Sequence, residues 1–320
     1  MTIFHSSSSV PAEARGAVVA IGNFDGVHLG HQAVLAQARA IADRLDTALA
    51  VLTFEPHPRS VFQPDLPDFR LTPLPAKVEA LKAAGVDHVI VLDFTPEFSQ
   101  RSAEDFMSGV LCADLGARHI VVGWDFCFGH KRSGNAAILA ARGAELGFGV
   151  TVTRAVENSE GQIYSSSRIR ECLRAGDLSG VAELLGRFWE IDGLVLHGDK
   201  RGRTIGFPTA NLSMEGYMHP TLGVYAVRAG MKDGGLDTDG EYRWVDGVAN
   251  LGIRPTVEGS RVQLEVHLFD FQEDLYGRFL RVQLIEFLRG EKKFDGLDSL
   301  KAQITSDCAQ ARRILALHTL

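Results

Sequence analysis

Residues 17–31 read A-V-V-A-I-G-N-F-D-G-V-H-L-G-H. An apolar run ends at Gly22, a glycine-rich stretch follows, and a helical pattern of apolar residues begins near Leu29. This order predicts a buried parallel strand over 17–21, a tight turn and a helix over 31–44. Because the first amides of a helix have no acceptor within the helix, such a turn is typical of a phosphate-binding site.

Strands and helices continue to alternate through the first half of the chain. We predict strands at 48–54, 88–93, 119–122 and 149–154, and helices at 75–84, 103–115, 136–146 and 167–174. This alternation indicates a parallel, doubly wound α/β sheet. The serine run at 6–9 is expected to be a loose terminus.

The pattern changes after Leu185. We predict strands at 189–196, 223–228, 242–250, 261–269 and 279–287, followed by one long helix at 297–317. A succession of strands with a terminal helix predicts a small antiparallel β-barrel. Two domains, 1–185 and 186–320, therefore suit a chain of 320 residues.

Composition narrows the classes of protein to consider. The hydrophobic fraction of 45% and the charged fraction of 23% are ordinary for globular domains. The net charge of −7 argues against a general nucleic-acid binder, so an anionic ligand needs local positive groups. The four cysteines show no zinc-like spacing, which predicts reduced thiols in a cytoplasmic protein. We expect neither a signal peptide at 1–16 nor a membrane span.

The first candidate site lies in the glycine-rich turn. His28 and His31 are three residues apart, so they share one face of the first helical turn. Two imidazoles there can stabilise charge that develops on an α-phosphate. Gly22, Gly26 and Gly30 allow the backbone to approach a phosphate closely. Capping or surface histidines are the usual alternative for an isolated H-x-x-H pair, but the glycine-rich flanks favour the phosphate site.

The second candidate site begins with residues 198–206, G-D-K-R-G-R-T-I-G, a locally basic loop. Residues 208–211 then read P-T-A-N. In an extended segment Thr209 and Asn211 point to the same side, and their oxygens suit Mg²⁺. A solvated hairpin tip and an Asx-type turn are the corresponding structural alternatives.

A carboxylate is available for the same site. In the alternating stretch 262–268, Gln263, Glu265 and His267 share the polar face. A carboxylate near the metal can take the proton of an attacking hydroxyl, so Glu265 is a candidate general base. An exposed strand glutamate is the alternative.

Longer motifs connect these patterns to a known family. Residues 53–59 read T-F-E-P-H-P-R, residues 122–134 read V-G-W-D-F-C-F-G-H-K-R-S-G, and residues 164–170 read Y-S-S-S-R-I-R. With residues 22–31, they resemble the N-terminal module of bacterial bifunctional riboflavin kinases/FMN adenylyltransferases, also called FAD synthetases. H-x-G-H alone occurs in many nucleotidyltransferases, whereas the run N-F-D-G that precedes it is more specific to this family.

The resemblance implies roles for particular residues of the first half. It implies ATP contacts at Gly22, Asn23, Phe24, Asp25, Gly26, His28, His31, Asp125, Ser166, Ser167 and Arg170. Of these, His28, His31 and Arg170 would be catalytic. It implies flavin contacts at Pro56, Pro58, Phe62 and Phe128. Ser167 stands where the family usually has threonine, which keeps the hydroxyl. An ordinary proline-rich loop and a core position for Phe128 are the structural alternatives.

The second half resembles the riboflavin kinase module. Matching segments lie at 186–212, 223–227, 247–257 and 274–294, the last containing D-L-Y-G-R and F-L-R-G-E-K-K-F. The resemblance implies Mg²⁺ binding by Thr209 and Asn211, with Glu265 as catalytic base. It implies ATP and flavin contacts at Gly202, Arg203, Gly206, Pro208, Thr209, Asn211 and Arg278.

These observations predict a cytoplasmic enzyme of two activities. Riboflavin would be phosphorylated by ATP to FMN, and FMN would then be adenylylated by a second ATP to FAD and pyrophosphate. The alternatives are a nucleotidyltransferase/kinase for another phosphate ester and a flavin-binding regulatory protein. The resemblance implies a monomer or a transient self-assembly. The net charge and the lack of a long apolar run predict neither nucleic acid nor membrane as partner. Residues 1–16 and 231–240 match no motif.

Overall fold

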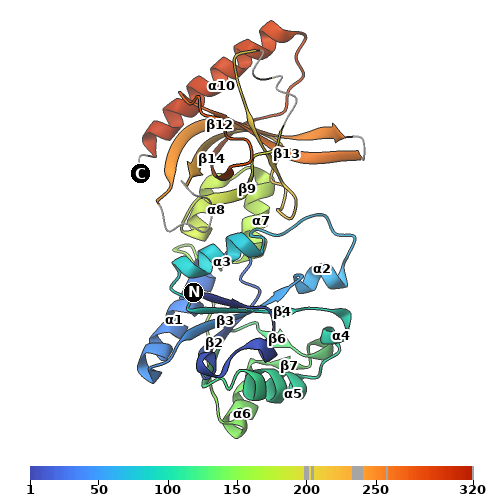
Figure 1. Cartoon of the computed structure of the whole chain (residues 1–320), viewed down its shortest axis with the longest axis vertical. Helices are drawn as coiled ribbons and strands as arrows, with labels where there is room; N and C mark the ends of the chain where they lie inside the picture. The colour runs from blue at the N-terminus through green and yellow to red at the C-terminus, as the bar shows by residue number, and fades with distance from the viewer. Residues whose placement is uncertain (198–201, 203–204, 233–240, 257–258, 319–320) are drawn as a thin grey trace. The chain divides into compact units, whose positions relative to one another are not determined.

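The protein is described by a computed structural model that covers residues 1–197, 202, 205–232, 241–256 and 259–318. Its described residues divide into two compact units. The first unit is Met1–Pro67 with Thr72–Ser166, and the second is Asp68–Leu71 with Ser167–Leu320. Figure 1 colours both units along the chain. The functional boundary after residue 185 stays a prediction, and residues 167–185 pack with the second unit.

The first unit is built on a parallel sheet of order β1–β4–β3–β2–β5–β8. Its strands are β1 (Thr2–Phe4), β2 (Val18–Ile21), β3 (Leu49–Glu55), β4 (His88–Asp93), β5 (His119–Gly123) and β8 (Gly149–Thr153). The strand order reverses between β2 and β5, which creates a topological switch point. The predicted doubly wound fold is confirmed.

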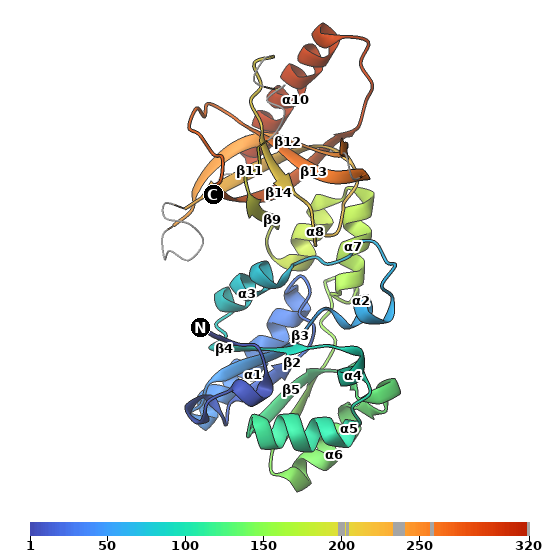
Figure 2. The same ribbon diagram turned by 45° about the vertical axis from the view of Figure 1, so that its right-hand side comes forward.

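Helices cover both faces of this sheet, because alternate strand residues point to opposite sides. Val18 and Ala20 pack into the cluster formed with α1 (Leu29–Leu45) and α3 (Leu74–Ala83). Val19 and Ile21 pack into a second cluster, formed with the π-helical segment η3 (Phe106–Asp114) and with α6 (Ala136–Leu146). Figures 1 and 2 show α3 on one side of the sheet and α6 on the other.

Shorter elements complete the first unit. They are η1 (Ser7–Ser9), η2 (Ala12–Ala14), α2 (Pro58–Phe62), α4 (Pro96–Ser99), α5 (Ala103–Asp105), β6 (Cys127–Phe128), η4 (His130–Arg132) and β7 (Gly134–Asn135). The expectation of a loose terminus at residues 6–9 is wrong. Thr2 pairs with His88 in the sheet, and the buried Ser7 donates a hydrogen bond from Oγ to Asp114 at 2.6 Å. A buried hydroxyl with a carboxylate partner holds this segment in place.

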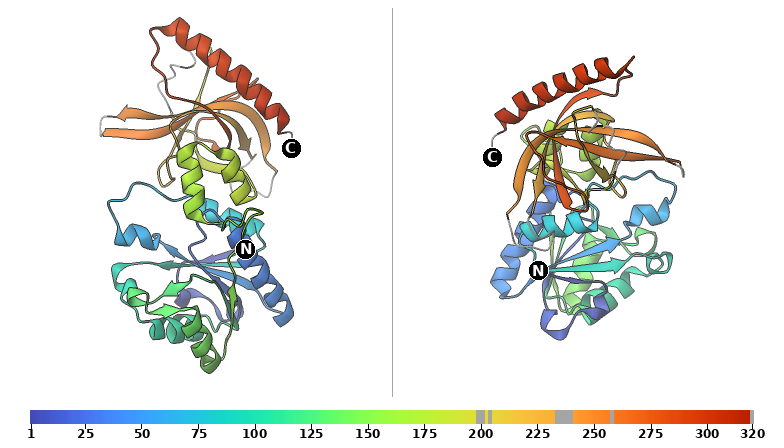
Figure 3. Two further views of the ribbon diagram at one scale, coloured as in Figure 1. Left: turned by 180° about the vertical axis from the view of Figure 1, so that it is seen from behind. Right: turned by 45° about the horizontal axis from the view of Figure 1, so that its top comes forward.

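The second unit contains an antiparallel sheet of order β10–β13–β12–β11–β14–β9. Its strands are β9 (Trp189–Leu194), β10 (Ala210–Ser213), β11 (Gly223–Met231), β12 (Arg243–Thr256), β13 (Gly259–Leu268) and β14 (Phe279–Gly290). A bridge between Leu196 and Asn211 nearly closes the sheet into a barrel. This confirms the predicted antiparallel barrel, which Figure 3 shows from two further directions.

Three helices and a short inserted segment pack in the second unit as far as it is described. The helices are α7 (Ser166–Ala175), α8 (Leu178–Leu185) and α10 (Leu297–Leu317). The segment Asp68–Leu71 comes from the first half of the chain. Arg70 C=O accepts a hydrogen bond from Met218 N at 2.7 Å, and Leu71 C=O accepts one from Trp189 Nε1 at 2.9 Å.

The terminal helix α10 is fixed to the barrel by apolar and charged contacts. Ala311 and Leu315 pack on Val224 from β11. Asp307 is buried in the helix and receives hydrogen bonds from Arg289 on β14, at 3.0 Å from Nε to Oδ1 and 2.7 Å from Nη2 to Oδ2. A two-pronged guanidinium–carboxylate contact of this kind sets orientation as well as adding energy.

We expect Asp307→Ala to loosen α10. The change leaves Arg289 without its carboxylate partner, which costs about 2 to 4 kcal/mol for a largely buried pair. Amide hydrogen exchange along α10 in the full chain should become faster. Ser306→Ala, at an exposed position of the same helix, is the control and should leave exchange unchanged. Wild-type exchange rates in Asp307→Ala would contradict this role.

Candidate functional site

The motifs of the first unit follow three neighbouring parallel strands. Gly22 follows β2, Pro56 follows β3, and Trp124 follows β5. Because β2 pairs with both β3 and β5, the motifs emerge at the same carboxyl edge, beside the switch point. Open α/β sheets bind ligands at this place.

The two predicted catalytic histidines lie face to face at the start of α1. His28 is the N-cap residue, and its Nδ1 accepts a hydrogen bond from His31 N at 3.3 Å. The ring centroids are 3.7 Å apart. Because His28 Nδ1 accepts in this contact, a ring proton of His28 is carried by Nε2.

The pKa of His31 lies well below its usual 6.5. Burial is the main cause, followed by the charges of His28 and Lys77. Within the described part of the chain, His31 Nδ1 has no hydrogen-bond partner. His31 is therefore a neutral imidazole near pH 7.

The glycine-rich turn between β2 and α1 has a strained backbone. Phe24 and Val27 have φ values of 48° and 44°, and Gly26 has a φ of 89°. The left-handed region is costly for a β-branched residue such as Val27, and strain of this kind concentrates at functional sites.

Polar contacts hold this turn in place. Thr72 N donates to Asp25 Oδ1 at 3.0 Å, and Gly26 N donates to Thr72 Oγ1 at 2.9 Å. Ser166 Oγ donates to the Asp25 carbonyl at 2.8 Å. Thr72 was not among the predicted site residues. It is 46 positions from Gly26, and no sequence spacing indicates that the two residues are in contact.

The predicted flavin contacts of the first unit differ in exposure. Phe62 is 64% exposed at the end of α2, whose first residue is Pro58. Phe128 is buried, with its ring centroid 5.5 Å from that of Phe106. Phe128 thus occupies the core, which was the structural alternative, and its flavin contact stays a prediction. Asp125, the predicted nucleotide contact, is exposed after β5.

Arg170 and Ser167 belong to the second unit. Arg170 is buried on α7, and its Nε donates to Phe69 C=O at 2.7 Å. Its guanidinium carbon also lies 5.3 Å from the centroid of the Phe69 ring. The segment that contains Phe69 therefore anchors this side chain, whose contact with triphosphate stays a prediction.

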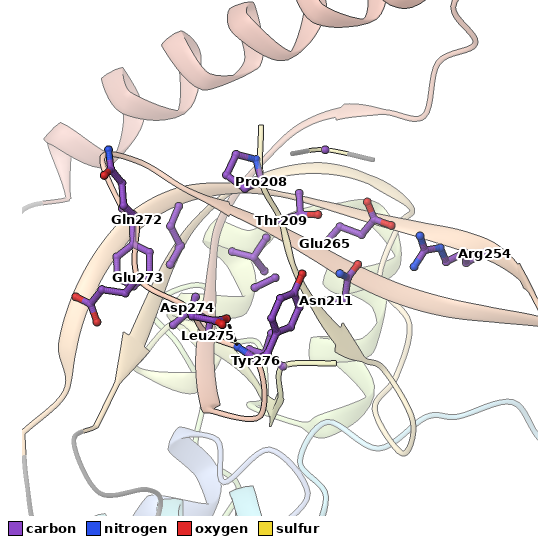
Figure 4. A pocket seen from close by; sticks show the side chains of 16 residues that line it. Pro208, Thr209, Asn211, Arg254, Glu265, Gln272, Glu273, Asp274, Leu275 and Tyr276 are labelled. Atoms are coloured by element: carbon purple, nitrogen blue, oxygen red, sulfur yellow. Dashed lines mark hydrogen bonds between the residues drawn. The ribbon is translucent and has the colours of Figure 1, made fainter. Parts of the chain in front are cut away.

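A cavity of about 850 Å³ opens in the second unit (Figure 4). Its lining includes the predicted residues Gly202, Pro208, Thr209, Asn211 and Glu265. Residues that sequence analysis did not select also line it, namely Val195, Ala210, Arg254, Val266, Leu268, Phe271, Gln272, Glu273, Asp274, Leu275 and Tyr276. Asp274, Leu275 and Tyr276 belong to the D-L-Y-G-R motif, which could have indicated them.

Strand register brings the metal candidates and the base candidate together. Asn211 on β10 is paired with Glu265 on β13, so the two side chains lie on the same face. Asn211 is buried, and Thr209 directly precedes β10. Figure 4 shows the three side chains next to one another.

His267 connects β13, the strand that carries the candidate base Glu265, to the P-T-A-N segment. Its Nδ1 lies 2.8 Å from the Pro208 carbonyl oxygen. Because a carbonyl can only accept, Nδ1 must carry the proton and donate it. Sequence analysis placed His267 on the face of Glu265 without a role, and the structure shows that it holds the residue before Thr209.

The remaining predicted kinase residues differ in where the structure places them. A Cβ at Gly202 would come within 2.3 Å of the Phe207 carbonyl oxygen, so glycine is required there. Gly206 has a φ of 92° in the following turn. Arg278 pairs with Glu273 at 3.3 Å and is not among the residues that line the cavity in the described structure. Arg203 lies outside the described residues.

The donor set fits magnesium bound together with phosphates. Among the described residues, no group of three or more His, Cys, Asp or Glu side chains is arranged to hold a metal ion. The Thr209 hydroxyl and the Asn211 amide are neutral oxygen donors, with one carboxylate nearby. Mg²⁺ commonly takes few protein ligands and completes its shell with water and substrate phosphate.

Comparisons with known proteins match two separate stretches of the chain. Family models described as FAD synthetase and riboflavin kinase match residues 10–168 and 185–315. A bifunctional riboflavin kinase/FMN adenylyltransferase from Haemophilus influenzae is 43% identical, covering 93% of this chain and 94% of that protein. The chain belongs to this family. The Escherichia coli K12 member is 41% identical, covering 98% and 96%.

A solved structure is also similar over nearly the full length. It is a Streptococcus pneumoniae crystal structure titled as a macrolide-efflux protein, with a TM-score of 0.82 and 30% identity, covering 96% of this chain and 97% of that one. In the described part of the present chain, no helix has the length and apolarity needed to cross a bilayer.

The low pKa of His31 predicts how stability depends on pH. In the unfolded chain this imidazole binds a proton near pH 6.5, whereas the folded protein resists protonation until lower pH. The contribution of His31 to the free energy of unfolding is fully present above pH 6.5. It is lost as the pH falls from 6.5 toward the pKa of His31 in the folded protein, with a slope of at most about 1.4 kcal/mol per pH unit.

Urea unfolding of the wild type and His31→Gln between pH 5 and 8 would measure this slope. The variant should lose less stability on acidification. Imidazole NMR that showed His31 titrating at or above pH 6.5 would contradict the prediction.

Proposed function

We propose that the second unit phosphorylates riboflavin to FMN at its cavity, and that the first unit joins FMN to the AMP part of a second ATP. The products of the second step are FAD and pyrophosphate. Family membership supports both reactions. The observation that carries the residue assignment is the pairing of Asn211 with Glu265 in a cavity that Thr209 also lines.

In the kinase reaction, Glu265 accepts the proton of the ribityl 5′-hydroxyl. The hydroxyl oxygen then attacks the γ-phosphorus of ATP, and the bond to ADP breaks in line. Thr209 and Asn211 would hold Mg²⁺, which when bound neutralises phosphate charge. His267 keeps the backbone before Thr209 in register with β13 through the Pro208 carbonyl.

In the adenylyl transfer, a phosphate oxygen of FMN attacks the α-phosphorus of ATP and pyrophosphate leaves. Negative charge accumulates on the α-phosphate oxygens during this step. His28 offers its Nε2–H, because its Nδ1 is already engaged by His31 N. Preorganised donors of this kind stabilise a transition state without moving. The remaining predicted ATP contacts, including Arg170, would bind the triphosphate.

Two alternatives are weaker. A different phosphate-ester substrate is compatible with H-x-G-H alone, but the match of the second half to the riboflavin kinase model favours flavin. A regulatory protein with inactive sites would not need Glu265 beside Asn211 or a strained turn beside His28. A cytoplasmic location is supported by four unpaired cysteines, and we keep monomer or transient self-assembly as the proposed state.

The function is tested by following riboflavin and Mg-ATP through FMN to FAD by chromatography. We expect Glu265→Gln to slow FMN formation by about 10² to 10⁴-fold while supplied FMN is still converted to FAD. His28→Ala should accumulate FMN. Glu286→Gln, at an exposed position of β14, is the matched control for the charge change. Wild-type protein that produced neither flavin nucleotide would overturn the proposal.

Gly30→Ala should impair FAD formation through His28. A Cβ at this position would lie 3.0 Å from His28 Cε1 and Nδ1 and 3.2 Å from the Tyr164 carbonyl oxygen. The imidazole must move, so we expect FAD formation to fall at least about tenfold, with unchanged FMN formation. Ala36→Ser, at an exposed position of α1, is the control. Wild-type FAD formation by Gly30→Ala would show that the His28 position is not critical.

A further inference from the structure

Lys77 is a buried cation that the mechanism above does not use. It lies on α3, its side chain is 2% exposed, and its Nζ is 3.0 Å from Glu55 Oε1 at the end of β3. Burying an ion pair carries a desolvation penalty and is weak evidence of a stabilising role. The position of this pair, at the same sheet edge as the histidines, points to another role.

Hydrogen bonds connect Lys77 to the strained turn. Lys77 Nζ lies 3.5 Å from Thr53 Oγ1, and Thr53 Oγ1 lies 3.3 Å from the Asn23 carbonyl oxygen. An ammonium can only donate and a carbonyl can only accept, so the Thr53 hydroxyl must receive from Lys77 and donate to Asn23. Both contacts are long. The contact of Lys77 with Thr53 is buried and that of Thr53 with Asn23 is partly buried, and a fixed donor direction has more effect there than in water.

Lys77 also acts on His31 through its charge. Of the groups that face His31, His28 comes from the start of the same helix and Lys77 comes from α3. Both lower the pKa of His31, in addition to burial. Glu55 balances the charge of Lys77 within the protein.

We propose that Lys77 is a positioning residue for adenylyl transfer, which acts with Glu55 and Thr53 to hold the N-F-D-G turn and the His28–His31 pair in place. With 2% of its side chain exposed, Lys77 does not touch substrate. Lys77 donates to the Thr53 hydroxyl, which in turn donates to the Asn23 carbonyl, while Thr72 N donates to Asp25 on the other side of the turn. This inference rests on the proposed function of the first unit.

The test uses full-length protein in four variants. Lys77→Met/Glu55→Gln removes both buried charges, and Thr53→Val removes the hydroxyl while keeping the charges. Thr53→Ser retains the hydroxyl, and Lys82→Met removes an exposed lysine from the same helix. For each, kcat and KM are measured for FMN adenylylation, and riboflavin phosphorylation is measured in the same preparation.

We expect kcat for FAD formation to fall at least about tenfold in the double variant and about fivefold in Thr53→Val. Thr53→Ser and Lys82→Met should stay within about twofold of the wild type, and FMN formation should be unchanged throughout. Imidazole NMR adds a readout that general destabilisation would not produce. The pKa of His31 should rise in the double variant and not in Thr53→Val, which keeps Lys77.

Unchanged FAD formation in the double variant and in Thr53→Val would overturn the proposal. Equal losses of FAD and FMN formation would also overturn it, because they would indicate a general loss of structure. If the double variant does not fold, Thr53→Val and Thr53→Ser decide the question, and equal activities overturn the proposal. Wild-type protein that makes no FAD is a different result, since it would remove the proposed function itself.

Discussion

Backbone pairing between strands places the residues of both candidate sites. In the second unit, the antiparallel register of β10 and β13 puts Asn211 opposite Glu265. A slip of one residue would turn one of these side chains to the other face of the sheet, so the proposed metal ligand and the proposed base would no longer share a cavity. In the first unit, the parallel pairing of β2 with β3 and β5 brings three separate loops to one edge.

The phosphate turn has unfavourable local conformations that tertiary contacts hold in place. Phe24 and Val27 occupy the left-handed region, which short-range sterics disfavour. Polar contacts support both sides of the turn, a partly buried one from Thr53 to Asn23 and a buried one from Thr72 to Asp25. Other conformations of the turn would leave these donors and acceptors unpaired, which costs free energy. Local strain with such support is expected where a protein must present donors in a fixed geometry.

The two units hold their donors by different means. The proposed adenylyl site uses a helix start, where His28 caps the first turn and is oriented by the amide of His31. The proposed kinase cavity uses paired strands. His267 on β13, the strand of the proposed base, is hydrogen-bonded to Pro208 of the P-T-A-N segment. A helix terminus supplies unpaired amides suited to phosphate, whereas a strand pair supplies side chains at a regular spacing suited to a metal and a base.

The sequence by itself determined the elements whose geometry repeats over a few residues. The alternation of strands and helices, the barrel strands, the shared face of His28 and His31, and the placement of Thr209 with Asn211 all follow from helical and strand periods. Only the tertiary structure decided the contacts of Thr72 and Lys77, the burial of Phe128, and the packing of Asp68–Leu71 in the second unit. These contacts join residues far apart in the chain, and no local period encodes which surfaces meet when the core closes.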